Sequence, residues 1–147
     1  MTYKTIISID DLKNNLNNDD FLIFDSRCDI KDSGYGIDSY TEGHIPNSIF
    51  VDVDTDLASE KRPGTGRHPL PDPNTFSEKL SHWGMSNNKQ VVVYDDAGGA
   101  FAGRLWWMLK WLGHDAVAVL DGGLNSWVKG GNKLVTTPTV FEKAHFE

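Results

Sequence analysis

Cysteine is almost absent from this sequence, which contains one, Cys28, in 147 residues. A single thiol excludes an intramolecular disulfide and is typical of a protein kept in a reducing compartment. The N-terminus also lacks a basic segment followed by an apolar one, as a secretory signal would have. No histidine or further cysteine lies at metal-binding spacing, so we expect no metal, and no other cofactor. Together these absences predict a cytoplasmic protein.

Long apolar runs and an excess of positive charge are missing as well. No apolar run approaches the roughly 20 residues that a membrane helix needs, which argues against a membrane partner. The 14 basic and 21 acidic side chains give a formal net charge of −7, which argues against nucleic acid as a partner. A chain of this length suits one domain with its own core.

The most informative segment runs from Gln90 to Leu112. It opens with an apolar run, residues 91–94, typical of a strand buried on both faces of a parallel sheet. It closes on apolar residues spaced i, i+3, i+4 and i+7, which predict a helix: Leu105, Met108, Leu109 and Leu112. A loop of small residues between strand and helix directs backbone N–H groups inward, where an anion is favoured. Its members are Asp95, Asp96, Ala97, Gly98, Gly99 and Ala100.

Asp95 occupies the first position of this loop, where a nucleophile would lie over the amides. One interpretation is a self-filled anion hole, whose carboxylate accepts the loop N–H groups that would otherwise hold an external anion. The other is a turn aspartate bonded to nearby backbone. Both rest on the same kind of hydrogen bond, so the sequence leaves them open.

The rest of the chain alternates predicted strands and helices. Strands are expected at 21–24, 49–51 and 116–120, and helices at 8–16 with Ser8 as the cap, at 74–83 with Thr75 and Glu78 as a capping box, and around Trp127. Residues 28–40 are predicted as a loop, 40–48 as a turn and 58–72 as a long loop. This alternation predicts an α/β fold, with a central, mostly parallel sheet and helices on both faces.

Five short motifs follow one another from Phe21 to Trp127, and their order and spacing are more specific than any one of them. They are Asp25-Ser26-Arg27, Gly43-His44-Ile45-Pro46, residues 91–95, residues 104–108 and residues 120–127. In these motifs the chain resembles the rhodanese superfamily. More narrowly, it resembles the N-terminal domain of two-domain thiosulfate and 3-mercaptopyruvate sulfurtransferases.

The resemblance implies a rhodanese-like domain of the inactive N-terminal type in residues 1–133. Residues 134–147, with Pro138 and little periodicity, are expected to begin an interdomain linker that leaves the domain rather than closing it. In the family, a C-terminal rhodanese domain carries a cysteine at the loop position that matches Asp95. That cysteine takes sulfur from thiosulfate or 3-mercaptopyruvate as a persulfide and passes it to a thiol or cyanide.

The full-length protein is therefore expected to be a sulfurtransferase, with this piece alone inactive. Its expected partners are the C-terminal rhodanese domain and a small-molecule sulfur donor at the interdomain cleft. Asp54 and His68 match positions from which a first domain reaches that cleft in mercaptopyruvate-type enzymes. A histidine that titrates near neutrality can move a proton as sulfur leaves the donor.

The remaining polar candidates are interpreted as structural. Asp25 and Arg27 are expected to form an ion pair or loop anchor, His44 to bond backbone in a tight turn, and Arg104 to pair with a nearby acid. Cys28 is interpreted as a small loop residue rather than a reactive thiol. Trp106, Trp107 and Trp111 suit either core packing or a face for the missing half.

A second hypothesis stands beside the enzyme. The chain can be a stand-alone, catalytically inactive rhodanese-like module that binds or regulates a partner. The two hypotheses differ in whether the reading frame continues past Glu147 into a second copy with cysteine in the loop. A phosphatase of the related dual-specificity type also needs the absent thiol and is excluded.

Overall fold

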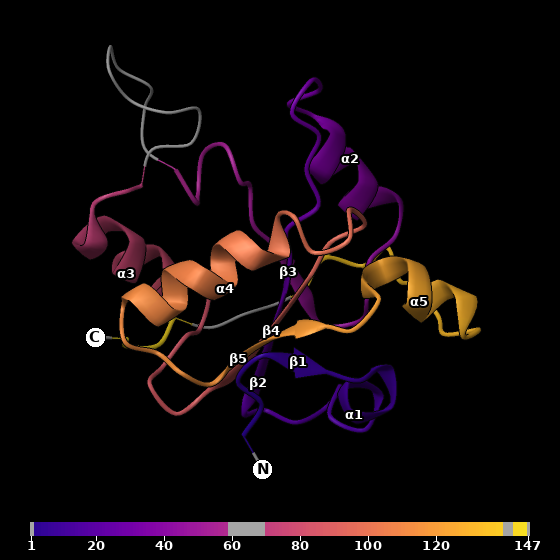
Figure 1. Cartoon of the computed structure of the whole chain (residues 1–147), viewed down its shortest axis with the longest axis horizontal. Helices are drawn as coiled ribbons and strands as arrows, with labels where there is room; N and C mark the ends of the chain where they lie inside the picture. Colours follow the sequence, from indigo (N-terminus) through magenta and orange to yellow (C-terminus); the bar gives the residue numbers. More distant parts are fainter. Residues whose placement is uncertain (1, 59–69, 140–142, 147) are drawn as a thin grey trace.

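The computed structural model describes residues 2–58, 70–139 and 143–146, and its strands form one parallel sheet in the order β1-β5-β4-β2-β3. The strands are β1 (Ile6–Ile7), β2 (Phe21–Asp25), β3 (Ser48–Phe50), β4 (Gln90–Tyr94) and β5 (Val117–Leu120). The helices are α1 (Ile9–Lys13), α2 (Tyr35–Glu42), α3 (Pro73–His82), α4 (Ala102–Trp111) and α5 (Gly123–Lys129), as drawn in Figure 1.

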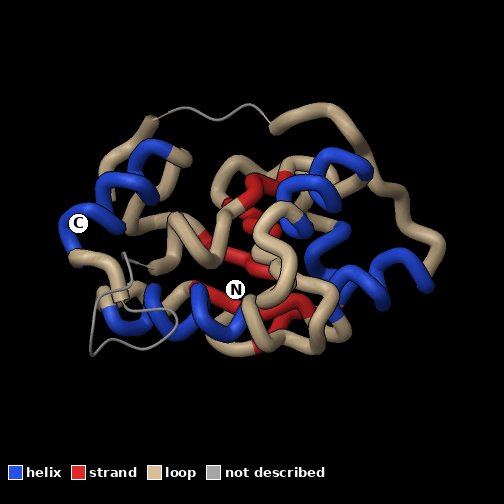
Figure 2. The backbone as a smooth tube through the Cα atoms, turned by 90° about the horizontal axis from the view of Figure 1, so that it is seen from above, coloured by secondary structure: helices blue, strands red, loops and turns tan. Residues whose placement is uncertain are grey.

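Strand β4 lies at the centre of the sheet, and its side chains alternate between two apolar clusters. Val91 and Val93 pack with residues of α3 and α4, whereas Val92 and Tyr94 pack with residues of α1 and α5. Figure 2 shows the strands in the middle of the molecule with helices on either side. The predicted α/β architecture is therefore confirmed. None of the described helices has the length and apolar character needed to cross a membrane.

Helix α2 occupies residues for which the sequence predicts a loop and a turn, and that prediction is wrong. Gly34 and Gly36 favoured a loop in the sequence, but Gly36 is buried within the helix. A Cβ atom at Gly36 would lie 2.2 Å from the carbonyl oxygen of Arg27. The glycine is there because two backbone segments approach closely, which a sequence pattern does not distinguish from a turn.

The helix starts show one confirmed cap and one correction. The side chain of Ser8 accepts the N–H of Asp11 and caps α1 as predicted. Helix α3 begins at Pro73, and its cap is Asp72, whose Oδ2 accepts the N–H of Thr75 at 3.1 Å. Thr75 therefore lies inside the helix and the predicted capping box is wrong. Proline at the first helical position fits this start, because its missing N–H would have had no helical partner.

The C-terminal segment packs onto the domain. Val135 and His44 exchange backbone hydrogen bonds of 2.9 and 2.8 Å. Further along, the N–H of Phe146 donates to Ser81 Oγ at 3.0 Å, and its ring is 3% exposed within the cluster beneath α3 and α4. The expectation that residues 134–147 leave the domain without closing it is wrong for the described part of this segment. Where an interdomain linker begins stays a prediction.

Candidate active-site loop and its surroundings

Several of the described candidate residues lie where β2, β3 and β4 end. In the sheet, Asp25 is opposite both Phe50 and Tyr94, so all three strands reach the same edge at this level. In open parallel sheets, ligands bind at the carboxyl ends of the strands. The segments after Asp25, Phe50 and Tyr94 therefore lie where a ligand site is expected.

Asp95 is bonded to backbone through both of its carboxylate oxygens. Its carboxylate is 1% exposed and accepts four backbone N–H groups. Oδ1 accepts from Ala97 at 3.0 Å and Gly99 at 2.9 Å, and Oδ2 accepts from Phe101 and Ala102 at 2.8 Å each. The last two donors lie at the start of α4, where the helix dipole favours an anion. The four N–H groups are thus all accepted by the protein's own carboxylate, an arrangement that fits both interpretations of Asp95.

The path of the loop depends on its glycines. Gly98 and Gly99 have φ values of 70° and 93°, in the left-handed region that residues with a Cβ rarely adopt. On the other side, the carbonyl oxygen of Asp95 accepts the N–H of Leu124 at 3.0 Å. Asp96 points a different way: its Oδ2 accepts the hydroxyl of Tyr35, which ties the loop to α2. Of the remaining loop residues, Ala97 and Ala100 are exposed.

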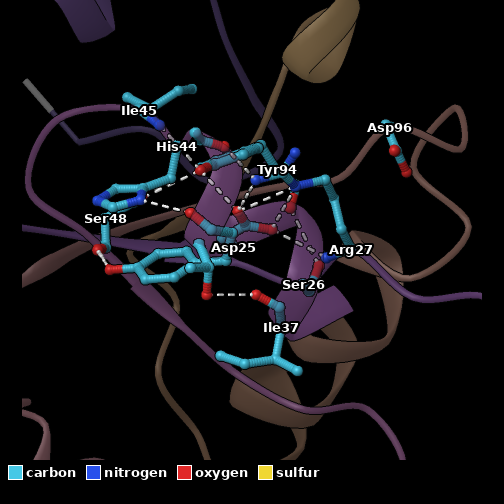
Figure 3. A network of polar contacts seen from close by, with 12 residues as sticks. Asp25, Ser26, Arg27, Ile37, His44, Ile45, Ser48, Tyr94 and Asp96 are labelled. Carbon is cyan, nitrogen blue, oxygen red and sulfur yellow. Dashed lines mark hydrogen bonds and ion pairs between the residues drawn. The ribbon is translucent and has the colours of Figure 1, made fainter. Parts of the chain in front are cut away.

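Asp25 and Arg27 form the predicted ion pair, and it is buried. Arg27 donates to both Asp25 oxygens, and the shortest of the bonds to Asp25 runs from Nη2 to Oδ2 at 2.8 Å. The same Nη2 donates to the carbonyl oxygen of Gly43 at 2.7 Å. Burial lowers the pKa of Arg27, but its hydrogen bond to Asp25 and the charge of that carboxylate raise it on balance. The pair, in the centre of Figure 3, anchors the end of β2 to the segment after α2.

Tyr94 completes this network, and sequence reasoning identified it only as a strand residue. Its hydroxyl donates to Asp25 Oδ2 at 2.9 Å and accepts the N–H of Ile45 at 3.1 Å. It also lies 3.0 Å from Ser48 Oγ. Burial, followed by the charge of Asp25, raises the pKa of Tyr94 well above its ordinary value. One sequence feature could have revealed this network: a tyrosine at the end of a buried valine run, because a buried hydroxyl requires hydrogen-bond partners.

His44 and Arg104 both bond to carbonyl oxygens of the backbone. The ring of His44 is unexposed, with Nδ1 2.9 Å from the oxygen of Tyr40 and Nε2 2.9 Å from that of Thr137. Its role as a backbone partner is therefore seen directly. Arg104 donates Nε and Nη2 to the carbonyl oxygen of Leu57 at 3.0 and 2.7 Å. These two bonds reach a carbonyl group, and the pairing of Arg104 with an acid stays a prediction.

Of the two residues predicted to reach the interdomain cleft, Asp54 is described by the structure and His68 is not. Asp54 is exposed after β3, its N–H donates to Asp52 Oδ1 at 2.9 Å, and it lines a small cavity with Arg27 and Cys28. His68 lies outside the described residues, so its place is not tested. Among the residues that the structure describes, no group of three or more metal-binding side chains comes together.

Cys28 is half-buried after β2 and has no place in the amide ring. Burial, together with the charges of Asp54, Asp52 and Asp29, raises the pKa of its thiol to about 11. Only the thiolate is a nucleophile, so a raised pKa means that alkylation accelerates with pH until the pKa is reached.

We therefore expect the alkylation rate of Cys28 by iodoacetamide to rise about tenfold per pH unit from pH 7 to 10 and to level off near pH 11. Glutathione, measured alongside by mass spectrometry or thiol titration, should level off near the pKa of a free thiol, about 8.5. A plateau for Cys28 below pH 9 would show that the neighbouring carboxylates do not suppress this thiolate.

Comparisons with known proteins give the family. A model of the rhodanese-like domain matches residues 8–130. A probable 3-mercaptopyruvate sulfurtransferase from Pseudomonas aeruginosa is 42% identical over 149 residues, a match that covers 100% of this chain and 52% of that protein. Thiosulfate/3-mercaptopyruvate sulfurtransferase 2 from Arabidopsis thaliana is 37% identical over 131 residues, covering 88% of this chain and 37% of that one.

The solved structures agree with this result. The 3-mercaptopyruvate sulfurtransferase from Leishmania major superposes with a TM-score of 0.87 and 32% identity, over 96% of this chain and 39% of that one. A 3-mercaptopyruvate sulfotransferase from Escherichia coli gives a TM-score of 0.85 at 27% identity, over 99% and 56%. This chain thus spans about half or less of the length of these relatives. With the family model matched over most of its length, the chain belongs to the rhodanese-like domain family.

Proposed function

We propose that this chain is the non-catalytic first domain of a two-domain sulfurtransferase. The whole protein would move sulfane sulfur from thiosulfate or 3-mercaptopyruvate to a thiol or cyanide, through a persulfide on a cysteine of the second rhodanese domain. The observation that carries the proposal is the carboxylate of Asp95, which accepts four backbone N–H groups in the loop where the family's active domains hold their cysteine.

The chemistry explains why this domain needs a partner. A persulfide forms when a thiolate attacks the donor sulfur and the bond from that sulfur to the rest of the donor breaks. Thiosulfate then leaves as sulfite, and 3-mercaptopyruvate leaves as the enolate of pyruvate, which takes up a proton. Amides around the loop stabilise the persulfide anion that results. Asp95 already fills that amide ring, and a carboxylate cannot carry a persulfide. Cys28 lies elsewhere, and its raised pKa keeps it protonated at neutral pH. A thiolate from outside this chain is therefore required, and the relatives are long enough to supply a second domain.

The domain itself would form one side of the interdomain cleft. Asp54 stands exposed at the carboxyl edge of the sheet, beside Cys28 and Asp52. We propose that Asp54 and His68 reach a donor held by the second domain, with His68 as a proton carrier. In the proposed two-domain protein, Asp54→Asn and His68→Asn should each lower kcat by at least tenfold. An unchanged kcat would remove that residue from the cleft.

A sulfurtransferase assay tests the proposal. The 147-residue chain and the longer gene product would each be given thiosulfate or 3-mercaptopyruvate with cyanide, and thiocyanate would be measured. The chain alone should show no turnover, and the longer protein should lose activity when the cysteine of its second loop becomes serine. Cys28→Ser in the longer protein should leave activity unchanged. Turnover by the 147-residue chain would refute the proposal. An inactive gene product that ended near Glu147 would favour the stand-alone binding module.

We also propose a cytoplasmic location, which the single cysteine supports because it permits no intramolecular disulfide. One relative, from Arabidopsis thaliana, is named as mitochondrial. Fractionation of cells that express the protein would decide the location, and recovery in an organelle or secreted fraction would refute a cytoplasmic one.

A further inference from the structure

Helix α4 presents two stacked tryptophans to solvent. Trp107 and Trp111 are 48% and 40% exposed, and their rings lie 9° from parallel with centroids 6.1 Å apart. We call this pair the tryptophan face. Trp106 differs, because it is half-buried and its Nε1 donates to the carbonyl oxygen of Lys4 at 2.9 Å. Large aromatic rings are costly to leave in water, and adjacent exposed ones mark interaction surfaces.

The described chain ends beside this helix. The ring of Phe146 makes an edge contact with the ring of His114, with centroids 5.7 Å apart, and His114 lies three residues beyond the end of α4. Figure 1 shows the last described residues, in yellow, near the end of α4 at which Trp111 lies. Polypeptide that continued past Phe146 would begin near the C-terminal end of α4, which is Trp111.

The same helix leads to the candidate site. Helix α4 starts at Ala102, whose N–H is one of the four that Asp95 accepts. At 1.5 Å per residue, Trp107 lies about 8 Å and Trp111 about 14 Å along the axis from that start. A domain of about 130 residues has a radius of gyration of about 14 Å. One such domain can therefore cover the loop of Asp95 and the tryptophan face together.

We infer that the tryptophan face is a docking surface for the second rhodanese domain of the same polypeptide. This inference rests on the proposed function. Two observations select this occupant: the chain spans 52% of its Pseudomonas aeruginosa relative, and its described end lies at α4. Covering the two adjacent indoles would bury a continuous apolar area, provided that each Nε1–H finds an acceptor on the partner domain.

Hydroxyl-radical footprinting read by mass spectrometry tests the inference. Oxidation of Trp107 and Trp111 would be compared between the 147-residue chain and the longer gene product at equal concentration. We expect at least about fivefold less oxidation of both in the longer protein, as a covered side chain loses solvent contact. Val128, 49% exposed on α5 at the opposite layer of the sheet, is the reference and should be labelled equally in both.

Paired variants extend the test to stability. Trp107→Gln with Trp111→Gln in the longer protein should separate its single thermal unfolding transition into two, because the domains no longer stabilise one another. Val128→Gln, which replaces an equally exposed apolar residue, should keep one transition.

Equal oxidation of both tryptophans in the two proteins, with a longer protein that transfers sulfur, would overturn the docking surface and leave the proposed function standing. Protection in the 147-residue chain that grew with concentration and a doubled mass would assign the face to a second copy and overturn the inference. A gene product that ended at Glu147 would overturn the inference together with the proposed function.

Discussion

Replacing Asp95 with alanine is expected to lower the free energy of unfolding by about 4 kcal/mol, because a buried donor left without an acceptor costs about 1–3 kcal/mol. Four N–H groups lose their acceptor at once, of which that of Ala102 is buried and the other three are partly buried. Entry of water and relaxation of the glycine-bearing loop keep the total below the sum of four separate penalties. Urea denaturation at neutral pH measures the effect.

Two further variants separate the carboxylate from its position. Asp95→Asn keeps one acceptor oxygen and should lose about half as much, about 2 kcal/mol. Asp121, exposed directly after β5, stands at the equivalent end of the neighbouring strand. Asp121→Ala should change stability by no more than about 0.5 kcal/mol. A loss for Asp95→Ala within about 1 kcal/mol of this control would mean that the amide ring does not depend on its anion.

Removal of the carboxylate should also reopen the ring to small anions. Sulfate or thiosulfate that binds the vacated amides would stabilise Asp95→Ala by about 1.4 kcal/mol at ten times its dissociation constant, by mass action. Wild-type protein should gain nothing at the same ionic strength, because Asp95 occupies the site. Equal stabilisation of both proteins would point to a general salt effect and would contradict the self-filled anion hole.

The central strand, loop and helix are predictable because their information is local. The valine run and the helical spacing after the loop both lie within residues 90–112, and the structure places β4 and α4 there. The position of Asp95 at the end of the strand follows from the same pattern. Its four donors do not, because they depend on the path of a loop whose glycines adopt left-handed conformations.

The sequence-based predictions that are wrong concern contacts between segments distant in the chain. Gly36 is required by the carbonyl group of Arg27, across a packed interface that no local pattern reveals. Phe146 is held by Ser81, 65 residues earlier in the chain. Residues 134–147 therefore resemble a linker in sequence although their described part completes the core. The hydroxyl of Tyr94 joins Asp25 and Ile45 in the same non-local way.

Replacing Arg27 with methionine is expected to cost about 4 kcal/mol of folding stability, in the range found when one partner of a buried ion pair is removed. The change leaves the carboxylate of Asp25 without its cation and removes a donor from the carbonyl oxygen of Gly43, and both residues are buried. Lys79 is the control, because its ion pair with Asp56 at 3.4 Å is partly exposed. Lys79→Met should cost no more than about 1 kcal/mol.

A double-mutant cycle shows whether the cost belongs to the pair. Asp25→Asn combined with Arg27→Met removes both charges. The double variant should lose at least about 2 kcal/mol less stability than the two single losses add up to. Additive losses would mean that Arg27 acts through Gly43 rather than through Asp25. In the longer protein, Arg27→Met should lower kcat/KM only in proportion to the folded fraction. A raised KM in fully folded protein would instead make Arg27 a substrate contact, because the variant would then bind the sulfur donor less tightly while keeping its fold.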